Sequence, residues 1–267
     1  LFGAAAQFGI FFTLVVASLL GFPLKDAASI AIIGAADGPT SIFVANYLGS
    51  NYIGPIIIAA YSYMSLVPIV QPPIIKLLTS KKERRIRMEY TGSSVSKTTK
   101  ILFPIIVTVI AGLFAPRSVA LVGFLMFGNL IRECGVLNSL SQTAQNALAN
   151  LITLLLGLTV AANMQAASFL TLKTLMIIGL GLVAFVFDTV GGVLFGKIIN
   201  LFVKKKVNPM IGAAGISAFP MASRVIHKMG LAEDKQNFLL MHAAGANVAG
   251  QIASVLAGGM LLNLIVK

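Results

Sequence analysis

The first residues of this sequence that could do chemistry lie where an aspartate and helix-breaking residues interrupt an apolar segment. Residues 32–49 read IIGAADGPTSIFVANYLG, in which Asp37 is followed directly by Gly38, Pro39 and Thr40. Gly38 and Pro39 free backbone carbonyls from helical hydrogen bonding, and Thr40 adds a hydroxyl. Carboxylate, carbonyl and hydroxyl oxygens replace water around an alkali cation. The stretch therefore favours a cation site at Asp37, and the simpler alternative is an aspartate that only caps the following half-helix.

A second break has a similar pattern. Residues 210–230 read MIGAAGISAFPMASRVIHKMG, and both stretches contain Ile-Gly-Ala-Ala followed by glycine, a hydroxyl and proline. Short runs of small residues are common in membrane helices, so a chance match is the competing explanation. If each stretch enters the membrane and returns on the same side, the two are inverted copies, as in transporters with a binding site near the midplane. If each stretch crosses fully, they are parallel copies.

Further polar residues lie around these two breaks. Tyr61 and Ser65 share a face of the helix that follows the first break, whereas Tyr63 points elsewhere. Arg224 has two interpretations: it extends its charge to water or pairs with a carboxylate, or it recognises an anionic or carbonyl group. The second break and the segments beside it also supply three uncharged polar residues, Asn208, Ser217 and Asn247.

Two other acidic residues lie in or near apolar segments. Glu133 adjoins Arg132, which predicts a local ion pair. Asp188 lies among glycines, where a cap or a pair across helices is favoured over a cation site. Cys134 is the single cysteine, so no intrachain disulfide can form and a small buried residue is expected.

The composition indicates the elements that must position these residues. The chain is 57% hydrophobic and only 10% charged, with a mean hydropathy of +0.93. Such a chain cannot keep a soluble surface, and apolar runs of about 20 residues predict an all-α polytopic membrane protein with its two broken stretches meeting near the midplane. Besides the two breaks, we expect helices at 1–22, 53–78, 101–115, 118–132, 146–163, 168–203 and 236–266.

The basic residues mark the orientation. The formal net charge is +12, and eight of the 20 basic residues lie between Lys76 and Lys100, with three more at 204–206. Both clusters follow long apolar runs, which is typical of cytoplasmic loops, so no nucleic-acid partner is expected. Four segments between the clusters make an even number of crossings, and the helix 53–78 runs from outside to inside.

These patterns predict one membrane domain over 1–267. It divides into a first repeat module at 27–78, a cytoplasmic basic loop at 79–100, intervening helices at 101–206 and a second module at 207–266. The sequence starts at Leu1 within an apolar run, and we expect further helices before it.

Five motifs together resemble a known family. GAADGPTSIF, YSYMSLVPIVQPPI, GNLIRECGV, NPMIGAAGISAFPMASRV and HAAGANVAGQIAS are similar to those of the membrane-embedded beta subunit of the biotin-dependent sodium-translocating decarboxylases, which act on oxaloacetate, glutaconyl-CoA, methylmalonyl-CoA or malonate. The resemblance implies a multi-pass protein of a bacterial or archaeal cytoplasmic membrane. It implies release of CO2 from carboxybiotin on a partner subunit, coupled to sodium export with a proton consumed. The implied partners are biotin-carrier and carboxyltransferase subunits, a small membrane gamma subunit and further beta subunits in an oligomer.

The resemblance also implies roles for single residues. The family's functional positions match Asp37, Tyr63, Asn208, Gly212, Ser217, Arg224 and Asn247. Together with the first break, this predicts sodium ligands at Asp37, Gly38, Thr40, Tyr63, Gly212, Ser217 and Asn247. The expected catalytic residues are Asp37, Tyr63, Asn208, Ser217 and Arg224, and carboxybiotin is expected to contact Asn208, Arg224 and Asn247.

Two other functions fit the same residues. A secondary transporter, either a sodium/proton antiporter or a sodium-coupled anion carrier, would use the two breaks without chemistry. A membrane anchor for a soluble enzyme would need neither break.

Overall fold

Most of the chain that the structure describes is helical. The structure is a computed structural model and describes residues 1–90, 92, 95–163 and 171–266; within these ranges it contains no strand. Among these described residues, six helical stretches are long and apolar enough to cross a membrane: Phe2–Leu19, Ile53–Leu78, Lys97–Phe114, Asn138–Ala162, Leu172–Phe202 and Leu240–Ile265. The prediction of an all-α polytopic membrane protein is therefore confirmed, while the inverted repeat stays a prediction.

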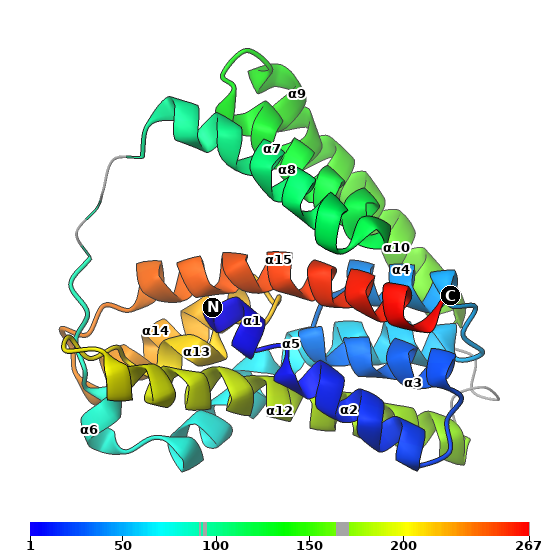
Figure 1. Ribbon diagram of the computed structural model, residues 1–267, viewed down its shortest axis with the longest axis horizontal. Helices are drawn as coiled ribbons and strands as arrows, with labels where there is room; N and C mark the ends of the chain where they lie inside the picture. Colours follow the sequence, from blue (N-terminus) through cyan, green and yellow to red (C-terminus); the bar gives the residue numbers. More distant parts are fainter. Residues whose placement is uncertain (91, 93–94, 164–170, 267) are drawn as a thin grey trace.

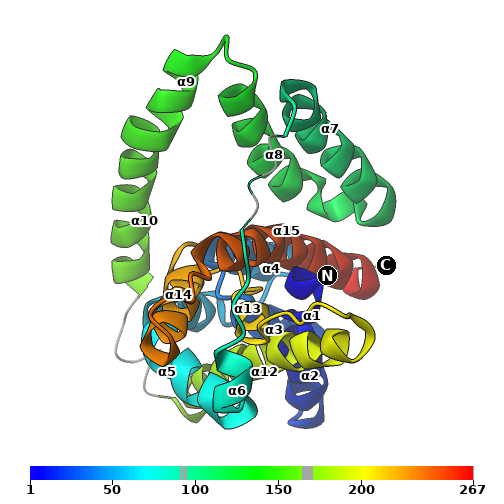
Figure 2. The same ribbon diagram turned by 90° about the vertical axis from the view of Figure 1, so that its left-hand side faces the viewer.

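The helices form a body and an overlying layer (Figure 1). The body is built on three long helices that run along one direction, α5 (Ile53–Leu78), α12 (Leu172–Phe202) and α15 (Leu240–Ile265). The overlying layer contains α7 (Lys97–Phe114), η2 (Pro116–Ser118), α8 (Val119–Glu133), α9 (Asn138–Thr143), η3 (Ala144–Leu148) and α10 (Ala149–Asn163). Figure 2 shows α7 and α8 together above α15, while α10 descends on the other side, where it contacts α5.

The first broken stretch is a re-entrant hairpin. It consists of α3 (Leu24–Ala31), η1 (Ile32–Ala35) and α4 (Gly38–Tyr47). The Asp26 carboxylate, at its start, accepts hydrogen bonds from Ser50 Oγ at 2.7 Å and from the Asn51 backbone N–H at 3.0 Å, beyond its end. Both ends of the stretch therefore lie on the same side of the body.

The second broken stretch is also closed at its base. It contains α13 (Met210–Ala213) and α14 (Met221–Glu233). The Arg84 carbonyl accepts hydrogen bonds from Asn208 Nδ2 at 3.0 Å and from Asn237 Nδ2 at 2.9 Å, so the two ends of this hairpin meet there. Arg84 ends α6 (Lys81–Arg84), just after the C-terminus of α5, whereas Asn51 precedes the N-terminus of α5. The two hairpins therefore enter from opposite ends of α5.

The two basic clusters lie at one end of the molecule. Lys205 Nζ is 3.5 Å from Glu89 Oε2, and Lys197 Nζ is 3.2 Å from Glu83 Oε1. These pairs join the end of α12 to the segment after α5. The arrangement agrees with the even number of crossings expected between the clusters.

Two expected helices differ in detail. The segment expected at 1–22 is present as the membrane-length stretch Phe2–Leu19, but Ala6 and Gln7 interrupt it between α1 (Phe2–Ala5) and α2 (Phe8–Leu19). Gln7 Nε2 donates to the Gly3 carbonyl at 3.0 Å and to the Gly215 carbonyl at 3.3 Å, so the interruption is stabilised by the second hairpin.

The polar segment expected to be a loop before residue 146 is helical from Asn138. Most of its side chains are exposed, and exposed polar side chains do not prevent a helix from continuing. The start of the expected helix 168–203 lies partly outside the described residues, and α12 follows at Leu172.

The two remaining acids near apolar segments have structural contacts. Asp188 Oδ1 accepts a hydrogen bond from the Ile10 backbone N–H at 3.2 Å, which caps the N-terminus of α2 from a neighbouring helix. Glu133 lies 3.9 Å from Arg132 Nε and 3.6 Å from Lys100 Nζ. The sequence interpretations of both residues agree with these contacts.

Candidate functional site

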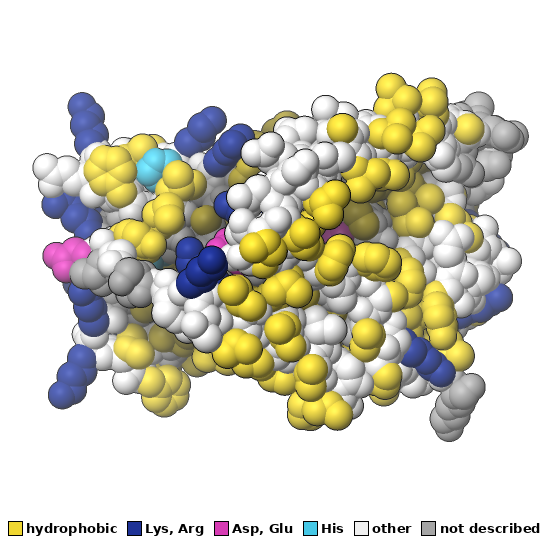
Figure 3. Space-filling view, turned by 90° about the horizontal axis from the view of Figure 1, so that it is seen from above, with side chains coloured by type: hydrophobic (Ala, Val, Ile, Leu, Met, Phe, Trp, Pro, Cys, Tyr) yellow, Lys and Arg dark blue, Asp and Glu magenta, His cyan; other side chains and the backbone are white. Residues whose placement is uncertain are grey.

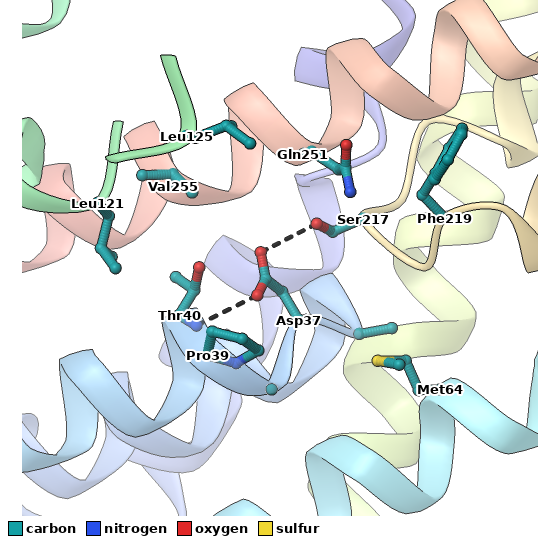
Figure 4. Close-up of a pocket in the computed structure, with 12 residues that line it drawn as sticks. Asp37, Pro39, Thr40, Met64, Leu121, Leu125, Ser217, Phe219, Gln251 and Val255 are labelled. Carbon is teal, nitrogen blue, oxygen red and sulfur yellow. Dashed lines mark hydrogen bonds between the residues drawn. The ribbon is translucent and has the colours of Figure 1, made fainter. Parts of the chain in front are cut away.

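The tips of the two hairpins meet at Asp37 and Ser217. The Ser217 backbone N–H donates to the Ala35 carbonyl at 3.0 Å, and Ser217 Oγ donates to Asp37 Oδ2 at 2.9 Å (Figure 4). Ala36, between the two first-hairpin residues, has a left-handed backbone with φ 51°. This turn ends η1 and lets Asp37 begin α4, so the break itself aims the carboxylate at the second hairpin.

The Asp37 carboxylate caps the following half-helix with one of its two oxygens, and the cation site stays a prediction. Its Oδ1 accepts from the Thr40 backbone N–H at 3.1 Å, which is an N-cap of α4. Its Oδ2 accepts from Ser217 Oγ and from Ser254 Oγ, each at 2.9 Å. The two hydroxyl oxygens are 3.2 Å apart. Capping uses only Oδ1, so Oδ2, which accepts the two serine hydrogen bonds, remains available for ion binding.

A cavity of about 310 Å³ adjoins this carboxylate. It is lined by the first hairpin's tip, by Ser217 and Phe219 of the second, by Gln251 of α15, and by Leu121 and Leu125 of α8 (Figure 4). Because a liquid water molecule occupies about 30 Å³, the cavity can hold an ion with several waters. The space-filling view shows a hollow rimmed by hydrophobic side chains on the face seen from above (Figure 3).

The charge of Asp37 is not balanced by a basic residue at this site. All residues that line the cavity are described, and none of them is lysine, arginine or histidine. A carboxylate in a membrane interior is stabilised by a cation or a proton. The adjacent hydroxyls and freed carbonyls are hard oxygen donors, which suit sodium. The donor set therefore fits a monovalent cation bound at Asp37.

Four of the other predicted sodium ligands lie at or beside this cavity. Gly38, Thr40 and Ser217 line it. Asn247 is fully buried on α15, and its Nδ2 donates to the Ile216 carbonyl at 2.6 Å. Asn247 therefore holds the residue before Ser217, and its Oδ1 has no hydrogen-bond partner among the described residues.

Two predicted sodium ligands are placed elsewhere. The Tyr63 hydroxyl donates to the Ile178 carbonyl, and its ring stacks on Phe185 with centroids 6.5 Å apart. Gly212 packs against α12 so closely that an added Cβ would lie 1.8 Å from the Gly192 carbonyl oxygen. Neither residue lines the Asp37 cavity, because α12 lies against both of them.

Asn208 and Arg224, expected to act together, are also separate from Asp37. Asn208 is fully buried, and its Nδ2 donates to the carbonyls of Arg84 and Ile86 at the base of the second hairpin. Arg224 is exposed on α14 and lines a second cavity of about 390 Å³ with Lys228. Asn208 does not line that cavity, since its side chain is hydrogen-bonded to backbone carbonyls of the basic loop.

The sequence interpretation missed Ser254. This side chain is fully buried and contacts Asp37 Oδ2 directly. The available signal was spacing, because Asn247, Gln251 and Ser254 are four and three residues apart and share one face of α15. Gln251 also lines the cavity.

The fold and the site define a class of protein: a multi-spanning helical membrane protein with a partly buried acidic site where two re-entrant hairpins meet. Residues 1–265 match the family model described as the Na+-transporting oxaloacetate decarboxylase beta subunit. The chain belongs to this family of integral membrane subunits, which are parts of decarboxylase complexes.

Similar curated proteins carry names from three decarboxylases. The chain is 54% identical over 265 residues to the methylmalonyl-CoA decarboxylase subunit beta of Propionigenium modestum, covering 99% of this chain and 67% of that one. It is 52% identical over 271 residues to the oxaloacetate decarboxylase beta chain of Haemophilus ducreyi, covering 99% and 62%. It is 51% identical over 265 residues to the glutaconyl-CoA decarboxylase subunit beta of Acidaminococcus fermentans, covering 99% and 70%. The chain thus spans about two thirds of the length of these relatives.

Proposed function

We propose that this chain releases CO2 from carboxybiotin carried by a partner subunit and couples that release to sodium export, with a proton consumed. The single observation that carries the proposal is the Asp37 carboxylate, hydrogen-bonded to Ser217 at the meeting point of two opposed hairpins. The proposed partners are biotin-carrier and carboxyltransferase subunits, a small membrane gamma subunit and further copies of the chain. The relatives' names support the decarboxylase assignment.

Sodium binding is assigned to the oxygens around Asp37. Ser217 and Ser254 donate hydrogen bonds to Asp37 Oδ2. When a cation binds, each hydroxyl hydrogen can rotate away from the cation, so that the lone pairs of the hydroxyl oxygen face it. Sodium bound there compensates the carboxylate charge, and proton binding at the same carboxylate does so in its absence. Asp37 can thus exchange one cation for the other without leaving an uncompensated buried charge.

The opposed hairpins would set the direction of sodium transport. The first hairpin is anchored by Asp26 at one end of the body and the second by Arg84 at the other. A displacement of one hairpin relative to the other would change the side of the molecule from which sodium can reach the Asp37 carboxylate. The Asp37–Ser217 hydrogen bond holds the two tips together in the arrangement that is closed to both sides.

Carboxybiotin is assigned to the Arg224 cavity. Arg224 and Lys228 are four residues apart on α14, and neither has an ion pair within the described ranges. Two uncompensated cations at a cavity of about 390 Å³ fit an anionic carboxylated ring. Carboxybiotin supplies a carboxyl group that leaves as CO2 when the ureido nitrogen gains a proton. Arg224 and Lys228 bind and orient the anion, and the proton and sodium meet at Asp37.

The test uses the purified complex in lipid vesicles. Free carboxybiotin is supplied, and CO2 release and sodium uptake are measured as sodium is varied. Sodium-stimulated CO2 release with parallel transport supports the proposal. Sodium/proton exchange without CO2 release supports the secondary transporter instead, which the same opposed hairpins would allow.

A further inference from the structure

Tyr61, which none of the assigned roles uses, lies directly over the first break. Its ring packs on Gly38 so closely that an added Cβ would be 2.2 Å from Tyr61 Cζ. The Tyr61 hydroxyl is buried and has no hydrogen-bond partner among the described residues. Leaving a buried hydroxyl unpaired costs free energy. A hydroxyl held in this state next to an ion-binding carboxylate is a candidate ligand.

Tyr61 also borders a large cleft along α4. The cleft has a volume of about 660 Å³ and is lined by successive turns of one α4 face, at Pro39, Phe43, Asn46 and Tyr47. At 1.5 Å per residue this face is roughly 12 Å long. It begins beside Asp37 and ends near the loop that holds the first hairpin at the end of the molecule opposite the basic clusters.

The cleft and the Asp37 cavity are neighbours. Pro39 and Leu121 line both of them, and Tyr61 lines only the cleft. The Tyr61 ring covers Gly38, the residue directly after Asp37. Pro39, Tyr61 and Leu121 thus form the partition between the carboxylate site and the cleft.

We propose that sodium leaves Asp37 through this cleft and that the Tyr61 hydroxyl oxygen is its next ligand. The hydroxyl oxygen has lone pairs for a cation and needs no change of charge. Asn46 and Tyr47 provide polar atoms farther along a lining that is otherwise mostly apolar. This inference rests on the proposed function, because it requires that Asp37 binds sodium.

The ligand role is tested with Tyr61→Phe, which removes only the oxygen. In the complete complex, we expect the sodium concentration for half-maximal CO2 release to rise about tenfold, corresponding to about 1.4 kcal/mol. Tyr52→Phe is the matched control, because Tyr52 precedes the same helix, packs edge-on against Phe22 and lines neither cavity. Tyr52→Phe should change the sodium concentration for half-maximal CO2 release less than twofold. An unchanged value in Tyr61→Phe overturns the ligand role.

The path is tested by chemical labelling in a Cys134→Ser background. A membrane-impermeant thiol reagent, applied from outside to cells, is expected to modify Asn46→Cys and to block sodium transport. Leu158→Cys is the control, because Leu158 is exposed on α10 and lies outside the cleft lining. Modification of Asn46→Cys only from the cytoplasmic side, or without any effect on transport, overturns the path.

Asp37→Asn in the same preparations separates the two levels of inference. If Asp37→Asn keeps sodium-stimulated CO2 release, the proposed function loses its sodium site at Asp37. If Asp37→Asn loses it while Tyr61→Phe and labelled Asn46→Cys behave like the wild type, the cleft inference alone fails.

Discussion

Ser217 Oγ donates a hydrogen bond to Asp37 Oδ2 at 2.9 Å, although the two residues are 180 positions apart in the sequence. Each lies in the break of a re-entrant hairpin, and the hairpins enter from opposite ends of α5. One hydrogen bond therefore reports whether the two tips are together, and the carboxylate that forms it also fits sodium.

The two serines should act as one unit. Ser217→Ala and Ser254→Ala each remove one hydroxyl beside Asp37 Oδ2. Because each hydroxyl oxygen is a proposed sodium ligand, we expect each variant to raise the half-saturating sodium concentration about tenfold, corresponding to about 1.4 kcal/mol. Because the two hydroxyls also contact each other at 3.2 Å, the double variant should lose less than the sum. Sodium titrations of CO2 release measure this.

Ser18→Ala is the matched control for the serines. Ser18 is exposed, and its Oγ donates to the Leu14 carbonyl within α2. The sodium titration of this variant should match that of the wild type. Strict additivity of the Ser217 and Ser254 effects contradicts a shared site.

Gly38→Ala should disrupt the first hairpin. Its Cβ would overlap the Tyr61 ring at 2.2 Å, so the ring or the start of α4 must move. Overpacking of this kind costs about 1–3 kcal/mol, and we expect a lower unfolding temperature in detergent together with loss of sodium-stimulated CO2 release.

Gly128→Ala provides the comparison for Gly38→Ala. Nothing lies within 4 Å of a Cβ at Gly128, on α8, so this variant should keep its stability and activity. A second comparison is Gly38→Ala combined with Tyr61→Val, which frees space and should recover part of the unfolding temperature. Full stability of Gly38→Ala alone contradicts the packing of Tyr61 on Gly38.

The closure of the second hairpin predicts a pH dependence. The Arg84 guanidinium donates a hydrogen bond to Glu233 at 2.6 Å and thereby lowers the pKa of that carboxyl. A lowered pKa in the folded state means that ionised Glu233 stabilises the fold above its ordinary pKa. This contribution is lost as the pH falls through the lowered pKa of Glu233. Thermal unfolding in detergent between pH 7 and pH 3 measures it.

Glu233→Gln should remove this part of the pH dependence. At pH 7 it should also lower stability by about 1–3 kcal/mol, because the Arg84 side chain is only 8% exposed and loses its charged partner. Asp234→Asn is the matched comparison and should lower stability less, since its partner Arg87 is 55% exposed and water screens the pair. Equal stability of Glu233→Gln and wild type at pH 7 contradicts the closure by Arg84.

The local breaks could be predicted from the sequence because their causes are local. Gly38 and Pro39 favour a new helix start, because proline is tolerated in the first helical turn, so the break at Asp37 and its partner break near Ser217 could be located from local residues and repetition. Gln7 has no such signature. The interruption there depends on the Gly215 carbonyl, which only the folded chain brings within reach.

The orientation of each helix about its own axis explains why the sequence did not show the positions of Tyr61, Tyr63 and Ser254. Tyr61 and Tyr63 are about 200° apart around α5, so only one of them can face the first hairpin. The packing of α12 decides which one, because it provides the Ile178 carbonyl for Tyr63 and leaves Tyr61 over Gly38. Ser254 was missed for a similar reason: it lies within a regular helix, and only the arrangement of α15 brings it to Asp37.

The most direct measurement is the sodium dependence of CO2 release by the reconstituted complex that carries Asp37→Asn. Free carboxybiotin is the substrate, and assembly of the complex is verified in parallel. Loss of the carboxylate charge should abolish both sodium stimulation and sodium transport while the complex remains assembled. Sodium-stimulated CO2 release at the wild-type rate in Asp37→Asn contradicts sodium coupling at this site.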